Sequence, residues 1–187
     1  MTVMTSNTFI SDYFSEIYKN ICDIDQSNLD SIIQRLKFVS NNNGKVIVVG
    51  NGGSAAIASH VSLDLTKAAG IRAINFNESD LLTCFANDYG YEHWVAMALH
   101  FYADPGDVVI LISSSGTSAN MLNGAAKSQS MNLHTITCTG FKDDNPLRGL
   151  GEINLWVNSA EYNIVETVHQ TWLLAVVDHI AQSSNKE

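Results

Sequence analysis

The amino-acid sequence predicts an α/β protein with a doubly wound, five-stranded parallel sheet preceded by two helices. Three observations lead to this class: five short runs of β-branched residues, helical patterns between those runs, and no internal repeat or linker. Strands that alternate with helices through short connections form a parallel sheet with helices on both faces. At 187 residues, we expect one domain over residues 1–187, with flavodoxin-like strand order 2-1-3-4-5.

Two amphipathic N-terminal helices are expected over residues 9–40. Apolar side chains recur three and four residues apart in 9–22 and again in 28–40, which places them on one side of each helix. These stripes either cover the domain's own core or also pair with another subunit, and the sequence leaves both roles open.

The α/β core is expected over residues 45–182. A continuous β-branched run such as KVIVVG, residues 45–50, is typical of a strand buried on both faces of a parallel sheet. Similar runs predict the other strands at residues 71–76, 107–112, 133–139 and 153–157. Helical patterns fall at residues 54–69, 91–103, 117–130 and 161–182.

Composition excludes several classes of partner and location. Nineteen acidic residues against ten basic ones give a net charge of −9, which argues against binding to nucleic acid or to an anionic membrane. Cys22, Cys84 and Cys138 are odd in number and lack CxxC spacing, so we expect reduced thiols rather than disulfides or a thiolate metal site. With neither a signal-like N-terminus nor a membrane-length apolar run, the sequence predicts a cytoplasmic protein.

Two predicted strands end in loops suited to an anion. Gly50-Asn51-Gly52-Gly53-Ser54 follows the first strand, and Ser113-Ser114-Ser115-Gly116-Thr117-Ser118 follows the third. Glycines allow close backbone approach, while free N–H groups at a helix start and nearby hydroxyls bind a phosphate. Each loop can also be a plain connection. In the expected strand order, however, both loops face one cleft, which predicts a phosphorylated small molecule as ligand.

Other ligand and enzyme classes fit less well. The first loop also matches a G-x-G-x-x-A dinucleotide fingerprint. That fold needs an acidic residue at the end of the second strand to hydrogen-bond the ribose hydroxyl, and in Asn75-Phe76-Asn77-Glu78 only Glu78 is near that position. We therefore expect no nucleotide cofactor. No Walker lysine or G-x-S-x-G elbow is present to suggest an ATPase or a hydrolase.

Two pairs of ionisable residues occur at helical spacing. His60 and Asp64 lie four apart after the first loop, and Glu166 and His169 lie three apart in the last helix. Such pairs place an imidazole and a carboxylate side by side, as acid–base or metal chemistry requires. On spacing alone, an ordinary partly buried histidine and solvated carboxylates explain them equally well.

Three segments, GNGGSAAIASH, FANDYG and ISSSGTSAN, resemble the sugar isomerase (SIS) domain family, and within it the phosphoheptose isomerases. The resemblance covers nearly the whole chain. It implies that sedoheptulose 7-phosphate is converted to D-glycero-D-manno-heptose 7-phosphate through an enediol, for lipopolysaccharide or other surface-glycan synthesis, by a homotetramer with sites between subunits. The implied substrate-binding residues are Asn51, Gly52, Gly53, Ser54, Asn87, Asp88, Ser113, Ser114, Ser115 and Ser118.

The resemblance also implies a zinc site with catalytic ligands. His60 matches the family histidine, Asp64 stands where the family has glutamate, Glu166 stands where it has glutamine, and Leu174 replaces a catalytic histidine. We expect His60, Asp64, Glu166 and His169 to bind a divalent metal, with Asp64, Glu166 and His169 in catalysis. Leu174 also motivates the alternative of a SIS protein without catalysis that binds a sugar phosphate or a replication-initiator partner.

Overall fold

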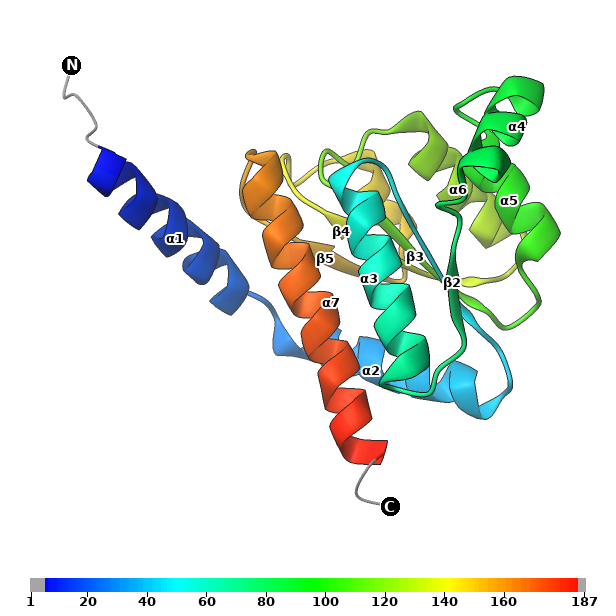
Figure 1. Cartoon of the computed structure of the whole chain (residues 1–187), viewed down its shortest axis with the longest axis horizontal. Coiled ribbons are helices and arrows are strands. Elements are labelled where there is room, and N and C mark those ends of the chain that lie inside the picture. The colour runs from blue at the N-terminus through cyan, green and yellow to red at the C-terminus, as the bar shows by residue number, and fades with distance from the viewer. Residues whose placement is uncertain (1–5, 185–187) are drawn as a thin grey trace.

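The computed structural model describes residues 6–184 and shows the α/β architecture that the sequence predicts (Figure 1). Five parallel strands form one sheet in the order β2-β1-β3-β4-β5, so the predicted strand order is confirmed. In the register of the central pair, Val46 of β1 lies beside Val108 of β3. The strands are β1 (Val46–Gly50), β2 (Ala73–Asn75), β3 (Val108–Ser113), β4 (His134–Thr139) and β5 (Ile153–Trp156).

Three helices cover one face of the sheet, and a fourth, the N-terminal helix, packs against the C-terminal one (Figure 1). Alternate strand residues such as Val46 and Val48 point to this side, where they form a buried cluster with the apolar faces of the helices. Trp172 lies in the same cluster. The helices are α1 (Ser6–Cys22), α2 (Gln26–Asn41), α3 (Gly53–Lys67) and α7 (Tyr162–Ser184).

The opposite face packs a second cluster, in which Ile47 and Val49 of β1 meet Trp94 and Leu147. The pattern over residues 91–103 predicts one helix, and the structure has one helix within that range and a further, unexpected one before it. The shorter α5 begins at Trp94, and α4 occupies part of the stretch expected as a connection. None of the residues of α4 is fully buried. The elements on this face are α4 (Ser79–Tyr89), α5 (Trp94–Tyr102), α6 (Ala119–Ser130) and the short 3-10 helix η1 (Pro146–Leu150).

Helix α1 projects from the body of the molecule (Figure 1). Its C-terminal half is anchored: the indole N–H of Trp172 donates to the carbonyl of Ile21 at 3.0 Å, and the Ser159 hydroxyl donates to the Glu16 carboxylate at 2.8 Å. Its N-terminal half leaves Phe9 and Phe14 exposed. The first helix therefore covers part of the core and also presents an apolar face to the surroundings. Within residues 6–184, no helix has both the length and the apolar character to cross a bilayer.

A buried ion pair joins the start of β1 to the start of β3. It lies at the end of the sheet where the strands begin. Lys45 Nζ lies 2.6 Å from the carboxylates of both Asp104 and Asp107. Asp107 is fully buried and also accepts hydrogen bonds from the backbone N–H groups of Lys45 and Asp104. This network holds the central strand pair in register.

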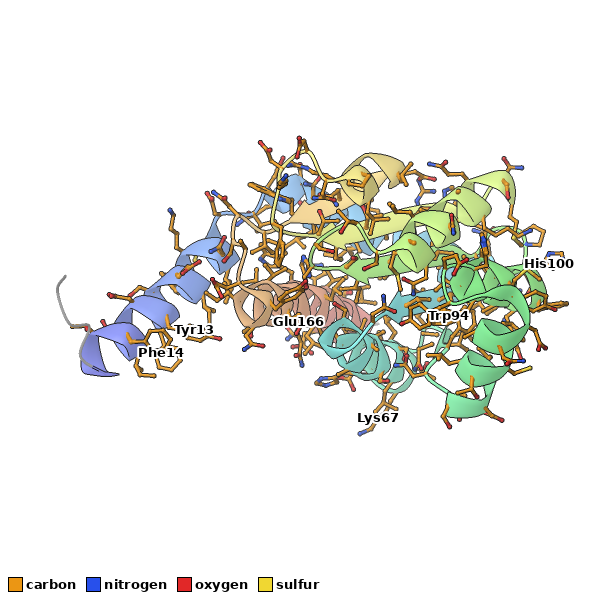
Figure 2. All side chains as sticks on the ribbon, turned by 90° about the horizontal axis from the view of Figure 1, so that it is seen from above. Tyr13, Phe14, Lys67, Trp94, His100 and Glu166 are labelled. Atoms are coloured by element: carbon orange, nitrogen blue, oxygen red, sulfur yellow. The ribbon has the colours of Figure 1, made fainter. Side chains whose placement is uncertain are left out.

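Removing the ammonium group of Lys45 is expected to destabilise the fold, because the carboxylate of Asp107 would stay buried without its partner. We expect Lys45→Met to lower the free energy of unfolding by about 3 kcal/mol, measured by urea denaturation. The matched control is Lys67→Met, since Lys67 is exposed at the end of α3 (Figure 2) and its loss should change stability by less than about 0.5 kcal/mol. Equal effects of the two substitutions would contradict this role.

Candidate active site

Two loops line a single cavity of about 340 Å³. They are the glycine loop after β1, residues 50–54, and the hydroxyl loop after β3, residues 113–118. They meet because β1 and β3 are neighbours in the sheet and end at the same edge. The start of α7 closes one side of the cavity with Tyr162 and Glu166. Eight residues expected to bind substrate line the cavity: Asn51, Gly52, Gly53, Ser54, Ser113, Ser114, Ser115 and Ser118.

The hydroxyl loop is equipped to hold a phosphate with neutral donors. Ser114 is almost fully buried, and its hydroxyl has no hydrogen-bond partner among residues 6–184. Ser118 begins α6 as its N-cap, yet its side chain makes no capping bond to that helix. No lysine or arginine is among the residues that line the cavity. Buried hydroxyls and the N–H groups of a helix start are a suitable environment for an anion.

A pair of asparagines joins the two loops. The amides of Asn51 and Asn120 exchange hydrogen bonds of 3.0 and 2.9 Å, which connects the loop after β1 to the first turn of α6. The hydroxyl of Tyr91 donates a further bond of 3.2 Å to the same Asn51 oxygen. The loops are thus held at a fixed separation before any ligand binds.

Glu166 is the acidic residue among those that line the cavity. Its carboxylate accepts a hydrogen bond from the backbone N–H of Ser54, at the start of α3. Gly53 permits this approach, because a Cβ at that position would overlap the carboxylate. Figure 2 shows Glu166 near the start of α7. Burial raises the pKa of Glu166, and the bond from Ser54 opposes that rise.

His60 and Asp64 form a second polar cluster in the seam between α3 and α7. The ring Nε2 of His60 lies 3.1 Å from the Asp64 carboxylate, and the amide Nε2 of Gln170 lies 3.1 Å from Nδ1 of the ring. If the amide donates to Nδ1, the Nε2–H of His60 is left to donate to Asp64. Neither His60 nor Asp64 lines the cavity that contains Glu166.

The expectation that His169 joins this site is wrong. Its ring is fully buried among sheet-facing residues of α7, and Nε2 lies 3.0 Å from the Thr139 carbonyl, with which it is hydrogen-bonded. Three residues beyond Glu166 the helix has turned toward the core, so the two side chains diverge. In the described residues 6–184, no three His, Cys, Asp or Glu side chains are grouped so as to hold a metal ion. The expected set of His60, Asp64, Glu166 and His169 is therefore not assembled.

Two further expected residues lie outside the cavity. Asn87 and Asp88 are exposed on α4, where the Asn87 amide donates to the Asp88 carboxylate at 2.9 Å. Conversely, the structure adds Tyr162 to the cavity and Gln170 to the His60 cluster, neither of which we expected. A four-residue period from Tyr162 through Glu166 to Gln170 is visible in the sequence and was the signal for this shared helix face.

Comparison with known proteins shows where this arrangement recurs. The family model for the SIS domain matches residues 11–140. A probable phosphoheptose isomerase from Thermoplasma volcanium is 32% identical over 167 residues, covering 86% of this chain and 84% of that protein. A phosphoheptose isomerase from Helicobacter pylori (strain HPAG1) is 34% identical over 134 residues, covering 68% of this chain and 69% of that protein.

Solved structures share the fold. A phosphoheptose isomerase from Neisseria gonorrhoeae superimposes with a TM-score of 0.86 at 24% identity, covering 94% of this chain and 99% of that one. One from Francisella tularensis gives a TM-score of 0.85 at 23% identity, covering 96% of this chain and all of that one. At these identities the structural likeness supports the fold.

The buried ring of His169 predicts a pH-dependent stability. Burial lowers the pKa of His169 to about 4, against the ordinary value of 6.5. Below pH 6.5 the unfolded chain therefore binds a proton that the folded chain does not. The stabilisation by the neutral ring is complete above pH 6.5 and falls as the pH is lowered, by about 3 kcal/mol near pH 4.

Urea unfolding of the wild type and of His169→Gln from about pH 7 to pH 4 measures this contribution. The variant keeps a donor for the Thr139 carbonyl, but its side chain does not titrate, so its stability should fall less with acid. His179→Gln is the control, because His179 is exposed on the same helix. Parallel curves for wild type and His169→Gln would refute the assignment.

Proposed function

Because the chain belongs to the SIS-domain family and is a sugar-phosphate isomerase, we propose that it converts sedoheptulose 7-phosphate to D-glycero-D-manno-heptose 7-phosphate in the cytoplasm, as a precursor for lipopolysaccharide or another surface glycan. The observation that carries the proposal is that the Glu166 carboxylate and the hydroxyl loop line one cavity. Relatives named as phosphoheptose isomerases support the choice of a heptose.

The two ends of the cavity suit the two ends of such a substrate. The Glu166 carboxylate already accepts the hydrogen bond from the N–H of Ser54 at the start of α3. We therefore assign the phosphate to the hydroxyl loop at the start of α6. There Ser114 has a free hydroxyl and Ser118 begins the helix. The carbon atoms that react would then lie toward Glu166.

Glu166 is the base in this proposal. Isomerisation requires removal of a proton beside a carbonyl and its return to the neighbouring carbon. A carboxylate in a partly buried cavity is suited to both steps, because its raised pKa makes it a stronger base than a solvated one. Asp64, the other candidate from the sequence, lies outside the cavity and is held by His60.

Zinc stays an expectation from the resemblance. The expected ligands of one chain do not fit a zinc site. His60 and Asp64 lie next to each other, but Glu166 lies in the cavity and His169 in the core. Two ligands fall short of the three or four protein ligands that zinc takes. No step of the proposed mechanism passes through a metal.

Leu174 supports a second candidate function, binding without turnover. This side chain is partly buried against the core, and it can neither transfer a proton nor bind a metal. Sedoheptulose 7-phosphate would then raise the melting temperature of the protein without being converted.

Turnover of sedoheptulose 7-phosphate by the purified protein distinguishes the two candidates. We expect conversion by the wild type and at least a 100-fold lower kcat for Glu166→Gln, which keeps the shape of the side chain but removes the base. Glu161→Gln is the control, since Glu161 is exposed directly before α7 begins and does not line the cavity. An unchanged rate for Glu166→Gln would overturn its role, and ligand-induced stabilisation without turnover would favour the binding protein.

We also propose that the chain forms a homotetramer, with α1 in the contact between subunits. Phe14 is 61% exposed and Phe9 54% exposed. Figure 2 shows Phe14 on the part of α1 that projects from the body. Tyr13, partly buried, stacks on Phe9 and meets Phe14 edge to face, so the three rings form one aromatic surface. Such a surface on a projecting helix is stabilised by burial against another chain.

A charge in this surface is expected to dissociate the tetramer. Phe14→Asp should shift the molar mass in solution from four chains toward one, measured by light scattering after gel filtration. Ser15→Asp adds the same charge beside the aromatic surface rather than within it, and should leave the mass unchanged. A tetramer that persists in Phe14→Asp would exclude α1 from the contact.

A further inference from the structure

Tyr162 lies at the first turn of α7, one helical turn before Glu166, and both residues line the cavity. Residues four apart share one face of a helix, so the phenol and the carboxylate are neighbours on the same wall. Tyr162 is 58% exposed and lines the cavity, so a ligand in the cavity can reach its side chain.

The ring of Tyr162 is held in place by Phe141. Their ring centres are 4.8 Å apart in an edge-to-face contact. Phe141 has a φ of +57°, a backbone conformation that is unfavourable for an aromatic residue. The backbone N–H of Phe141 donates to the Ser159 carbonyl at 2.8 Å, and the N–H of Gly140 donates to the Ser114 carbonyl at 2.9 Å. The aromatic pair is therefore braced against the hydroxyl loop.

We propose that the Tyr162 hydroxyl donates a hydrogen bond to the carbonyl oxygen of the substrate and carries the proton that moves between the two oxygens of the enediol. The inference rests on the proposed isomerase function and assigns the partner that Glu166 requires. Apart from Glu166 and Tyr162, the residues that line the cavity supply only serine hydroxyls as groups with an exchangeable side-chain O–H. A phenol is a stronger acid than a serine hydroxyl and therefore gives up its proton more readily.

The steps balance without any further reactant. Glu166 takes the proton from C1 of the ketose, and the electron pair of the C–H bond forms the double bond between C1 and C2. The electrons of the C2 carbonyl move to its oxygen, which receives the Tyr162 proton. The resulting phenolate takes the proton from the C1 hydroxyl as the C1 carbonyl forms, and Glu166 returns its proton to C2. Both side chains end in their starting states.

Tyr162→Phe tests the proposal, since it removes one oxygen and keeps the ring against Phe141. We expect kcat for sedoheptulose 7-phosphate to fall about 100-fold or more while KM changes less than about threefold, because the bond strengthens as charge develops on oxygen. Tyr102→Phe is the control, since Tyr102 is on α5 outside the cavity and stays packed on Phe76. A kcat within threefold of the wild type for Tyr162→Phe would overturn the proposal.

A hydroxamate analogue of the sugar phosphate, which mimics the charged enediolate, gives a second measurement. Its affinity should fall at least tenfold in Tyr162→Phe, whereas the affinity for inorganic phosphate should not change. Equal hydroxamate affinity in both proteins would overturn the role of Tyr162. A wild type that converts no ketose phosphate would overturn the isomerase function itself, and hydroxamate binding would then still decide whether Tyr162 contacts that oxygen.

Discussion

The pairing of β1 with β3 is the constraint on which the rest of the structure depends. The chain continues from β1 to β2 on one side of this pair and from β3 to β4 on the other, so the loops that follow β1 and β3 have no crossing helix between them. The Lys45 network secures the other end of the same pair. One end of the pair thus supplies rigidity, and the opposite end supplies the cavity in which Glu166 and the serine hydroxyls meet.

Much of the fold follows from local sequence, because buried parallel strands have an unmistakable composition. Runs such as KVIVVG are apolar on both faces, and the structure shows that residues Val46 to Val49 alternate between two separate clusters. Helix α4 was missed although its sequence carries a helical pattern. Leu81, Leu82 and Phe85 recur at helical spacing and pack, partly buried, against the second cluster.

The site was predictable where backbone geometry decides it and unpredictable where helix rotation does. Glycines and serines that directly follow predicted strands locate the two loops in the sequence, and this does not depend on what their side chains contact. The contrast between Glu166 and His169 depends instead on which side of α7 faces the sheet, and spacing of three residues was insufficient to keep both in the cavity. The same rotation that buries His169 brings Tyr162 and Gln170 onto the face of Glu166, a grouping that a four-residue period describes better.

The contact between Gly53 and Glu166 has an evolutionary consequence. Any side chain at position 53 would displace the carboxylate from the start of α3, while a shorter residue at position 166 would leave the Ser54 N–H without its acceptor. The two positions lie on different helices and are separated by more than a hundred residues, yet a change at one alters the contact made by the other. Descendants of this chain that change either residue are therefore expected to shift the acceptor that lies at the start of α3.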